Sequence, residues 1–300
     1  MIKTENLSKS FNSVQALKNV KLHVKKGSIY GLLGTNGAGK TTLLKLLAGI
    51  YKPSNGTITI NEQPSYENTA VKKQVVLIPD VTYFLPHSSI KQMGDFYQHF
   101  YPTWNQEKFE RLESIFNIDP NKKIHRLSKG MKRQVAFWLA LSIMPDILIL
   151  DEPIDGLDPV MRQKVKSLLF QDVAERQLTI LISSHNLREI EDLCDHVGIM
   201  DHGKLIIEKE LDNLKSDTHK VQVAFSSDEQ EQEIESQLRV LYKEKRGSVT
   251  LFIVKGTEHK IKQTIYRKNP ILFDLLPLTL EEIFIYEMGD IGYDIEKKLL

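Results

Sequence analysis

Cysteine is nearly absent from this sequence, because Cys194 is the single one among 300 residues. One thiol cannot form an internal disulfide or supply a cysteine-based zinc cluster, so both are excluded and no zinc is expected. A chain without disulfides is typical of a reducing compartment, and we therefore expect a cytoplasmic protein.

Long apolar runs are missing as well. No stretch approaches the roughly 20 apolar residues that a membrane-spanning helix needs. The segment Met1–Asn6 also lacks the apolar core of a signal peptide. If the protein works at a membrane, we expect a peripheral subunit on the inner face of the cell membrane.

Charge of one sign is not in excess. The 40 Lys and Arg residues nearly match the 39 Asp and Glu residues, which leaves a net charge of +1. No overall field would attract nucleic acid, so no nucleic-acid partner is expected. The composition, 41% hydrophobic and 26% charged, is that of a globular protein with one large core or two modest ones.

The larger of two domains is predicted over residues 1–215, with an α/β fold. Short β-rich runs alternate there with helices at Thr41–Ile50 and Val160–Glu175. A helix between two buried-looking strands is the βαβ unit of a parallel sheet. The predicted strands are Val20–Val24, Ser28–Leu33, Gly56–Ile60, Ile147–Leu150, Leu178–Ser183 and Val197–Met200.

A helical subdomain is predicted inside this domain, over about residues 85–145. Its aromatic side chains recur at spacings of one, three or four, which is typical of helices. We expect most of them to form the subdomain core. Part of the set around Tyr83, Phe84, Phe96 and Tyr97 is expected to form a groove for a helix of a membrane partner.

Residues 216–300 are predicted to form a second, α+β accessory domain. Its strand and helix patterns follow the order βαββαβ of a ferredoxin-like domain, and it has no catalytic motif. The predicted elements are Lys220–Phe225, Asp228–Leu238, Val240–Glu244, Val249–Val254, Glu258–Lys268 and Ile271–Leu276.

A phosphate-loop pattern lies between the strand Ser28–Leu33 and the helix Thr41–Ile50. Glycines let backbone N–H groups close around phosphates, Lys40 reaches the β- and γ-phosphates, and Thr41 offers its hydroxyl oxygen to Mg²⁺. This position disfavours the alternative, a glycine-rich turn with an incidental lysine. The predicted nucleotide-binding residues are Gly34, Thr35, Asn36, Gly37, Ala38, Gly39, Lys40, Thr41 and Thr42.

Two carboxylates, Asp151 and Glu152, end the apolar strand Ile147–Leu150. Open α/β sheets bind ligands at the carboxyl ends of their strands. Asp151 is then the Mg²⁺ partner of a P-loop NTPase, and Glu152 polarises the attacking water as general base. Alone, the pair could be solvated acids at a strand end, but the phosphate loop upstream favours the site.

A five-residue segment before a predicted helix resembles the LSGGQ signature of ATP-binding cassette (ABC) proteins. Ser128 can cap this helix, and its hydroxyl, the Gly130 amide and the helix dipole would favour a γ-phosphate. The resemblance extends over residues 1–216 and implies a P-loop ABC cassette with a mixed sheet and a helical subdomain. The signature segment is Leu127, Ser128, Lys129, Gly130 and Met131.

Further positions carry the same resemblance. His185, after a predicted strand, resembles the switch histidine that contacts the γ-phosphate. Phe11 stands where the family places an aromatic ring against adenine, although it could equally be a core residue. The segment that resembles the D-loop is Asp155, Gly156, Leu157 and Asp158.

Three departures from the family pattern stand out. Asp80 takes the place of the glutamine that links Mg²⁺ to the transport domain. A carboxylate can still bind Mg²⁺ through water, so Asp80 joins Thr41 and Asp151 as a predicted ligand. Asp155 replaces the usual serine of the D-loop, and two signature positions, Lys129 and Met131, differ from the commonest form.

The resemblance implies an ATPase that binds ATP and Mg²⁺. It implies a homodimer, or a heterodimer with a sister ATPase, in which Ser128 of one copy closes over the nucleotide of the other. Lys40, Glu152 and His185 are the implied catalytic residues. Together with Leu278–Phe284, the departures resemble the ABC-2 exporter branch, which works with separate integral membrane permease subunits and includes antimicrobial-peptide exporters of Gram-positive bacteria.

Two alternatives remain open at this point. The first is a soluble ABC ATPase that acts on ribosomes or DNA. A single compact cassette without heptads or a basic patch argues against it. The second is a non-hydrolysing, ATP-sensing regulatory subunit. Lys40, Asp151, Glu152 and His185 argue against it, because a chain released from catalysis has no need of all four.

Overall fold

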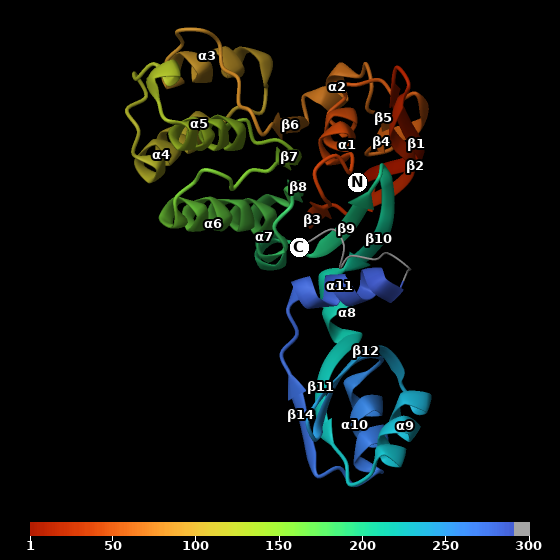
Figure 1. Ribbon diagram of the computed structural model, residues 1–300. Coiled ribbons are helices and arrows are strands. Elements are labelled where there is room, and N and C mark those ends of the chain that lie inside the picture. The colour runs from red at the N-terminus through yellow and green to blue at the C-terminus, as the bar shows by residue number, and fades with distance from the viewer. Residues whose placement is uncertain (291–300) are drawn as a thin grey trace. The chain divides into compact units, whose positions relative to one another are not determined.

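The structure is a computed structural model that describes residues 1–290 (Figure 1). It divides into two compact units, residues 1–208 and the residues from 209 onward. This division falls before the boundary expected at residue 215. Helix α8 (Leu211–Ser216) belongs to the second unit, because it packs on strand β11 (Thr218–Ala224) of that unit.

A six-stranded sheet is the centre of the first unit, in the order β10-β9-β3-β8-β7-β6. Strand β3 pairs in parallel with β8 and β9, and β7 pairs in parallel with β6 and β8. Strands β3, β7 and β8 are buried along their whole length, as central parallel strands must be. The strands are β3 (Ile29–Leu33), β6 (Val75–Ile78), β7 (Ile147–Asp151), β8 (Thr179–Ser184), β9 (His196–Asp201) and β10 (Lys204–Glu210).

A second sheet of the first unit is antiparallel, in the order β2-β1-β4-β5. One hydrophobic core contains residues of both sheets, such as Ile2 and Ile149, together with four leucines of helix α1 (Lys40–Leu47). Helix α1 therefore joins the two sheets through a shared core. The antiparallel strands are β1 (Ile2–Phe11), β2 (Val14–Val24), β4 (Asn55–Ile60) and β5 (Gln63–Pro64).

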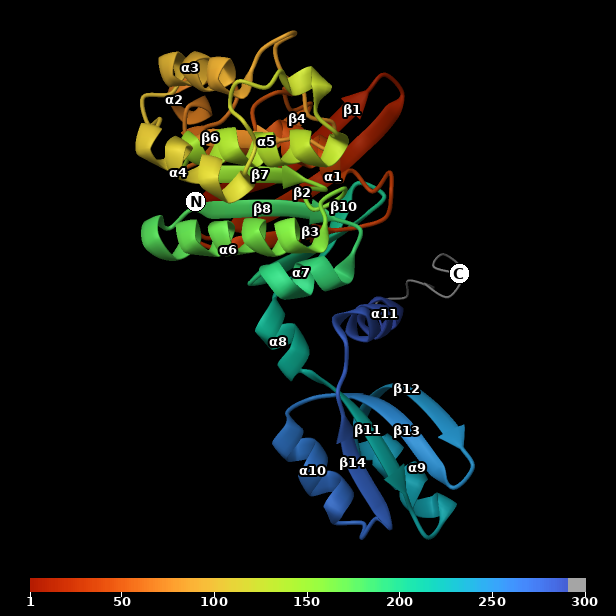
Figure 2. The ribbon, with the colours of Figure 1, turned by 90° about the vertical axis from the view of Figure 1, so that its left-hand side faces the viewer.

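Helices lie on both faces of the six-stranded sheet. Figures 1 and 2 show α1 on one face, and α6 (Pro159–Arg176) and α7 (Leu187–Leu193) on the other. The short α2 (Thr69–Lys72) precedes β6. This arrangement leaves the carboxyl ends of the parallel strands available for a site.

Three helices form the predicted helical subdomain: α3 (Ile90–Phe100), α4 (Gln106–Phe116) and α5 (Lys129–Ser142). Its core contains Trp138, which stacks on Phe109 and Phe116 with ring centroids 5.0 and 6.2 Å away. The indole N–H donates to the Phe109 carbonyl at 2.8 Å. Part of the aromatic repeat therefore forms a core, whereas Phe96 and Phe100 stay exposed.

The second unit follows the order β11-α9-β12-β13-α10-β14, which is the βαββαβ order expected from the sequence. Its sheet is antiparallel, in the order β12-β13-β11-β14. Apolar residues of this sheet pack with α9 and α10 in a core of their own. The remaining elements are α9 (Asp228–Gln237), β12 (Arg239–Arg246), β13 (Val249–Lys255), α10 (Glu258–Tyr266), β14 (Leu272–Leu276) and α11 (Leu280–Asp290).

Within residues 1–290, no helix combines the length and the apolar character that a bilayer crossing requires.

Candidate functional site

The phosphate loop connects the carboxyl end of β3 to the start of α1. Gly39 is the N-cap of α1, with φ of 105°, and a Cβ atom there would lie 2.9 Å from the Ala16 carbonyl oxygen. Gly37 has φ of 84° but faces open space. The path of the loop therefore requires glycine at position 39 both for its backbone angle and for its close approach to a neighbouring strand.

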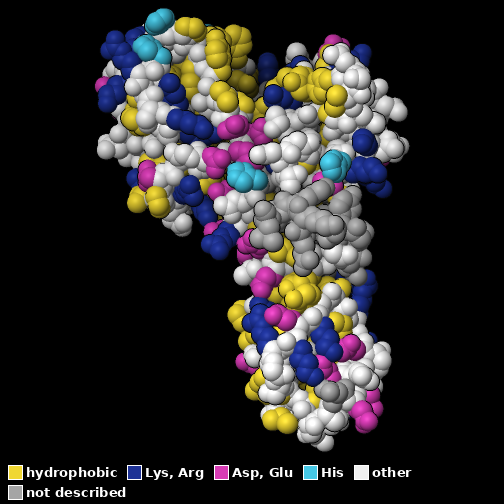
Figure 3. Space-filling view, in the orientation of Figure 1, with side chains coloured by type: hydrophobic (Ala, Val, Ile, Leu, Met, Phe, Trp, Pro, Cys, Tyr) yellow, Lys and Arg dark blue, Asp and Glu magenta, His cyan; other side chains and the backbone are white. Residues whose placement is uncertain are grey.

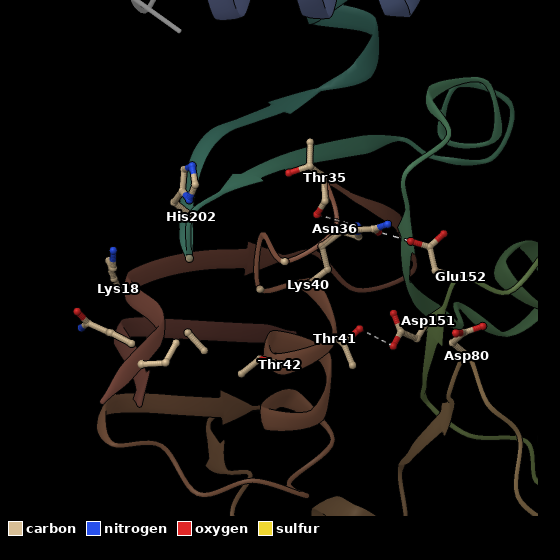
Figure 4. Close-up of a pocket in the computed structure, with 16 residues that line it drawn as sticks. Lys18, Thr35, Asn36, Lys40, Thr41, Thr42, Asp80, Asp151, Glu152 and His202 are labelled. Atoms are coloured by element: carbon tan, nitrogen blue, oxygen red, sulfur yellow. Dashed lines mark hydrogen bonds and ion pairs between the residues drawn. The ribbon is translucent and has the colours of Figure 1, made fainter. Parts of the chain in front are cut away.

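Lys40 is anchored by the backbone of its own loop. Its ammonium group donates to the carbonyl oxygen of Gly34 at 2.6 Å and to that of Thr35 at 3.4 Å. It also lies 3.6 Å from the Glu152 carboxylate, and the Lys40 side chain is almost fully buried (Figure 4). A positive charge is thus held at the centre of the loop, where phosphate oxygens could replace its present partners.

Asp151 is fixed by two hydroxyl groups. Thr41 donates to its Oδ2 at 2.8 Å, and Ser183 donates to its Oδ1 at 2.6 Å. Figure 4 shows Thr41 and Asp151 facing each other from α1 and the end of β7. Thr41 and Asp151 were both expected at one Mg²⁺ site from the sequence, whereas the contribution of Ser183 was not.

Glu152 lies at the end of β7 with φ of 46°, and its amide donates to the Ser183 hydroxyl at 3.1 Å. Its Oε2 lies 2.9 Å from Nδ1 of His185. Ligand-type atoms of Glu152, Asp155 and His185 all lie within 4.8 Å of one another. The three residues therefore form one polar group, and Figure 3 shows acidic side chains gathered beside β7 and β8.

A cavity of about 490 Å³ connects most of these residues. That volume is within the range of small-molecule sites. Part of the wall comes from the start of β2 and from the turn between β9 and β10, and no local motif predicted these residues. The lining residues are Val14, Gln15, Ala16, Lys18, Thr35, Asn36, Gly37, Gly39, Lys40, Thr41, Thr42, Asp80, Asp151, Glu152, His202 and Gly203.

Phe11 lies beside this cavity but outside its lining, which begins at Val14. Its ring packs edge-on against Tyr51 with centroids 5.3 Å apart, and the Lys9 ammonium lies 4.9 Å from the ring centroid. The ring is 38% exposed. Phe11 therefore lies on the surface of the antiparallel sheet, paired with Val14 of the cavity wall, and adenine stacking there stays a prediction.

The signature segment begins α5 away from the cavity. Ser128 is the N-cap and accepts a hydrogen bond from the Met131 amide at 3.2 Å. Ser128 and Lys129 are exposed, and neither lines the cavity of their own chain. A Cβ on Gly130 would lie 2.6 Å from the Gly156 carbonyl oxygen, so the signature and the D-loop are in contact.

Asp80 reaches the cavity from the loop after β6, where a residue missed by the sequence analysis holds it. Arg133 of α5 donates to the Pro79 carbonyl at 2.7 Å, to the Asp80 carbonyl at 2.6 Å and to the Asp80 carboxylate at 3.2 Å. Burial lowers the pKa of Arg133, and the nearby Asp80 carboxylate opposes that shift. No sequence signal singled out this residue, because Arg133 lies between Lys132 and Gln134 in the polar first half of α5.

The donor set fits a nucleotide with a hard divalent cation. The Thr41 hydroxyl and the Asp151 carboxylate are adjacent oxygen ligands of the kind that Mg²⁺ prefers. The Lys40 ammonium and the amides at the start of α1 are suited to phosphate oxygens. The oxygen donors, the positive charge and the cavity volume thus all fit a nucleotide bound with a divalent cation.

Comparison with known proteins identifies relatives of the chain. The family model described as ABC transporter matches residues 17–155. The ABC transporter ATP-binding protein YtrB of Bacillus subtilis (strain 168) is 35% identical over 295 residues, 96% of this chain and 98% of that protein. The bacitracin transport ATP-binding protein BcrA of Bacillus licheniformis is 35% identical over 223 residues, 73% of each chain.

A solved structure with a similar fold belongs to the same family as these relatives. An ATP-binding subunit of an ABC transporter matches with a TM-score of 0.67 and 26% identity, over 72% of this chain and 92% of that one. The cassette fold predicted from the phosphate loop, the signature and the carboxylate strand is confirmed. The chain belongs to the ATP-binding proteins of ABC transporters, a family of ATP-hydrolysing enzymes.

Proposed function

We propose that this chain is the ATPase subunit of an exporter and that it hydrolyses ATP as a dimer, with a second copy or with a sister ATPase. One observation carries the dimer: Ser128 lies at the exposed start of α5, outside the cavity of its own chain. The helix N-terminus there is suited to a phosphate that only another chain can bring. ABC ATPases dimerise and work with membrane subunits, which supports this arrangement.

Hydrolysis would begin with an exchange of partners at Lys40. Phosphate oxygens compete with Gly34, Thr35 and Glu152 for its ammonium group. Once Lys40 turns to the phosphates, the Glu152 carboxylate is free to orient a water molecule and accept its proton. His185 contacts Glu152 in this structure, and its imidazole would turn from there to contact the γ-phosphate.

Mg²⁺ is part of this proposal. Thr41 and Asp151 would hold the ion, Asp80 would reach it through water, and its charge would neutralise the phosphate oxygens. Ser183 contributes indirectly, because its hydrogen bond fixes the orientation of the Asp151 carboxylate. The remaining stabilisation of charge comes from Lys40 and from the signature of the other chain.

A separate apolar groove of about 190 Å³ is the proposed contact for a membrane subunit. It lies between β6 and α5, and Tyr83, which also lines it, is 77% exposed. A helix of a permease could bury apolar residues there. The groove residues include Ile78, Pro79, Tyr83, Phe84, Tyr97 and Leu139.

The cargo and the location follow from the same proposal. We place the protein on the cytoplasmic face of the cell membrane, bound to integral permease subunits. The relative named for bacitracin transport supports a cargo of the antimicrobial-peptide class. An accessory role for the second unit completes the proposal.

The decisive experiment compares the wild type with Glu152→Gln by light scattering and phosphate release. The amide cannot accept the proton of water, so ATP should stay bound and hold the closed dimer. We expect ATP-dependent dimers of the variant and turnover at least about a hundredfold lower than that of the wild type. Glu175→Gln, an exposed position on α6, is the matched control and should behave as the wild type does.

One outcome would restrict the proposal to a heterodimer, and another would contradict it. A wild type that remains monomeric and inactive with Mg-ATP would show that a homodimer is not sufficient, and a sister ATPase or permease would have to be added. A Glu152→Gln protein that turns over normally would exclude this carboxylate as the general base.

A further inference from the structure

Arg133 connects two regions of the first unit that serve different parts of the proposed function. It lies on α5, the helix that begins with the signature residue Ser128. Its guanidinium group holds Pro79 and Asp80 of the loop after β6 through three hydrogen bonds of 2.6 to 3.2 Å. The side chain is only 2% exposed, so these bonds replace water almost completely.

The geometry of this contact depends on arginine. Nη1 and Nη2 form a planar fork, in which Nη1 donates to the Pro79 carbonyl and Nη2 donates to the Asp80 carbonyl and to one oxygen of the Asp80 carboxylate. A lysine ammonium is a point charge on a flexible stem, so it cannot reproduce the fork. A glutamine has the donors for part of the contact but lacks the charge.

The loop that Arg133 holds borders two cavities. Asp80 lines the nucleotide cavity, and Pro79 lines the apolar groove proposed for the membrane subunit. Helix α5 lines the same groove with Ala136 and Leu139. A displacement of α5 therefore reaches the groove directly through its own side chains, and it reaches the Asp80 loop through Arg133.

Charge makes this contact sensitive to the contents of the nucleotide cavity. Asp80, Asp155 and Asp151 all act electrostatically on the Arg133 guanidinium. A cation at Thr41 and Asp151 would weaken the attraction that these acids exert on Arg133 and would compete for the Asp80 carboxylate. The contact would then loosen when the cavity is loaded and tighten when it is empty.

We propose that Arg133 is a positioning residue that transmits movement between the signature helix and the Asp80 loop, and so between the nucleotide cavity and the groove. The inference rests on the proposed function, because it assumes that the signature moves when the dimer closes. Arg133 does not line the nucleotide cavity. It acts through the position of Asp80.

The first test measures the loop without nucleotide. Thr82→Cys introduces a thiol into the half-buried wall of the groove, whereas the native Cys194 is buried and burial raises the pKa of its thiol. We expect thiol reagents to label the introduced thiol about tenfold faster when Arg133→Gln is added, the factor expected from one lost charge-assisted hydrogen bond. Adding Arg133→Lys instead should give an intermediate rate. Lys132→Gln removes a charge from the adjacent helix position and should leave the rate unchanged.

The second test measures ATP turnover in the full chain. Arg133→Gln should lower kcat about tenfold while the KM for ATP changes by less than about twofold, because the phosphate loop is untouched. In an Asp80→Asn background, Arg133→Gln should lower kcat by a smaller factor than it does in the wild type, since the two residues share one contact. Lys132→Gln should keep the wild-type kcat.

The outcomes separate this inference from the proposed function. A labelling rate that Arg133→Gln leaves unchanged would show that Arg133 does not hold the loop. Faster labelling with unchanged kcat, or additive losses with Asp80→Asn, would leave Arg133 as a purely structural residue and overturn the transmission. If even the wild type shows no turnover, the homodimer is not the active form, and the turnover comparison is made with the sister ATPase or permease added, while the labelling rates still decide whether Arg133 holds the loop.

Discussion

Glu152 and Gly39, both in the wall of the nucleotide cavity, adopt positive φ for different reasons. Glu152, with φ of 46°, takes this conformation at the end of β7, where Ser183 binds its amide through both a backbone oxygen and a hydroxyl. The bend turns the carboxylate toward Lys40 and His185. Strain of this kind persists only where neighbouring contacts fix it. Gly39, in contrast, has no side chain, and its position brings its backbone close to Ala16.

Substituting Gly39 with alanine should destabilise the first unit more than substituting Gly37. Both positions carry the positive-φ penalty of about 1 to 2 kcal/mol for an L-residue. A Cβ at position 39 would also meet the Ala16 carbonyl and Leu17, each 2.9 Å away, whereas position 37 is open. We expect Gly39→Ala to lower the free energy of unfolding by at least about 1 kcal/mol more than Gly37→Ala, measured by urea denaturation without nucleotide. Equal losses would mean that the backbone near Ala16 shifts freely.

At the scale of elements, a buried ion pair fastens the helical subdomain to α6. Lys108 of α4 donates to Asp172 of α6, and both side chains are at least nine-tenths buried. Arg176 donates to the second oxygen of Asp172 at 2.9 Å and also to the Pro145 carbonyl. Burial lowers the pKa of Lys108, and the hydrogen bond to Asp172 opposes that shift. The carboxylate thus compensates two cations in a region with little water.

Lys108→Met should therefore destabilise the protein although it replaces a charge with an apolar chain. It leaves Asp172 buried with Arg176 alone, and breaking one side of a buried pair typically costs about 3 kcal/mol. Denaturant unfolding should show a loss of that order. Lys166→Met is the control, because its partner Asp192 is 63% exposed, and it should cost less than about 1 kcal/mol. Similar losses for the two variants would refute the role of burial.

The sequence predicted the elements that carry local patterns. The phosphate loop, its flanking strand and helix, and the carboxylates after Ile147–Leu150 are contiguous motifs, so each could be recognised without its neighbours. Strand β1 was missed because polar residues and several register shifts interrupt its alternation. The contact of Arg133 with Asp80 joins residues 53 positions apart, and no local pattern encodes such a pairing.

At the scale of the whole molecule, the described residues contain a separate hydrophobic core in each unit. The core of the first unit contains Leu181 and residues of α1, and the core of the second contains Phe252 with residues of α9 and α10. Both side chains are fully buried. Each unit thus has a core of its own, while only the first contains the nucleotide cavity.

Calorimetry should distinguish the two units. Phe252→Ala should destabilise the second unit by about 3 to 5 kcal/mol and lower one thermal transition. A non-hydrolysable ATP analogue should raise a different transition, that of the first unit, because ligands stabilise only the fold that binds them. Leu181→Ala is the corresponding control in the core of the first unit, and it should lower the transition that the analogue raises. A single transition that shifts as one in all these samples would show that the units unfold together.

The positions of the two tryptophans have a practical consequence. Trp104 and Trp138 are the protein's only indoles, and both belong to the helical subdomain. Trp138 is enclosed by Phe109 and Phe116, whereas Trp104 is half-buried against Phe109. Tryptophan fluorescence, excited selectively at long wavelength, thus comes from this subdomain alone, and its changes during an ATP cycle would report on that part of the chain.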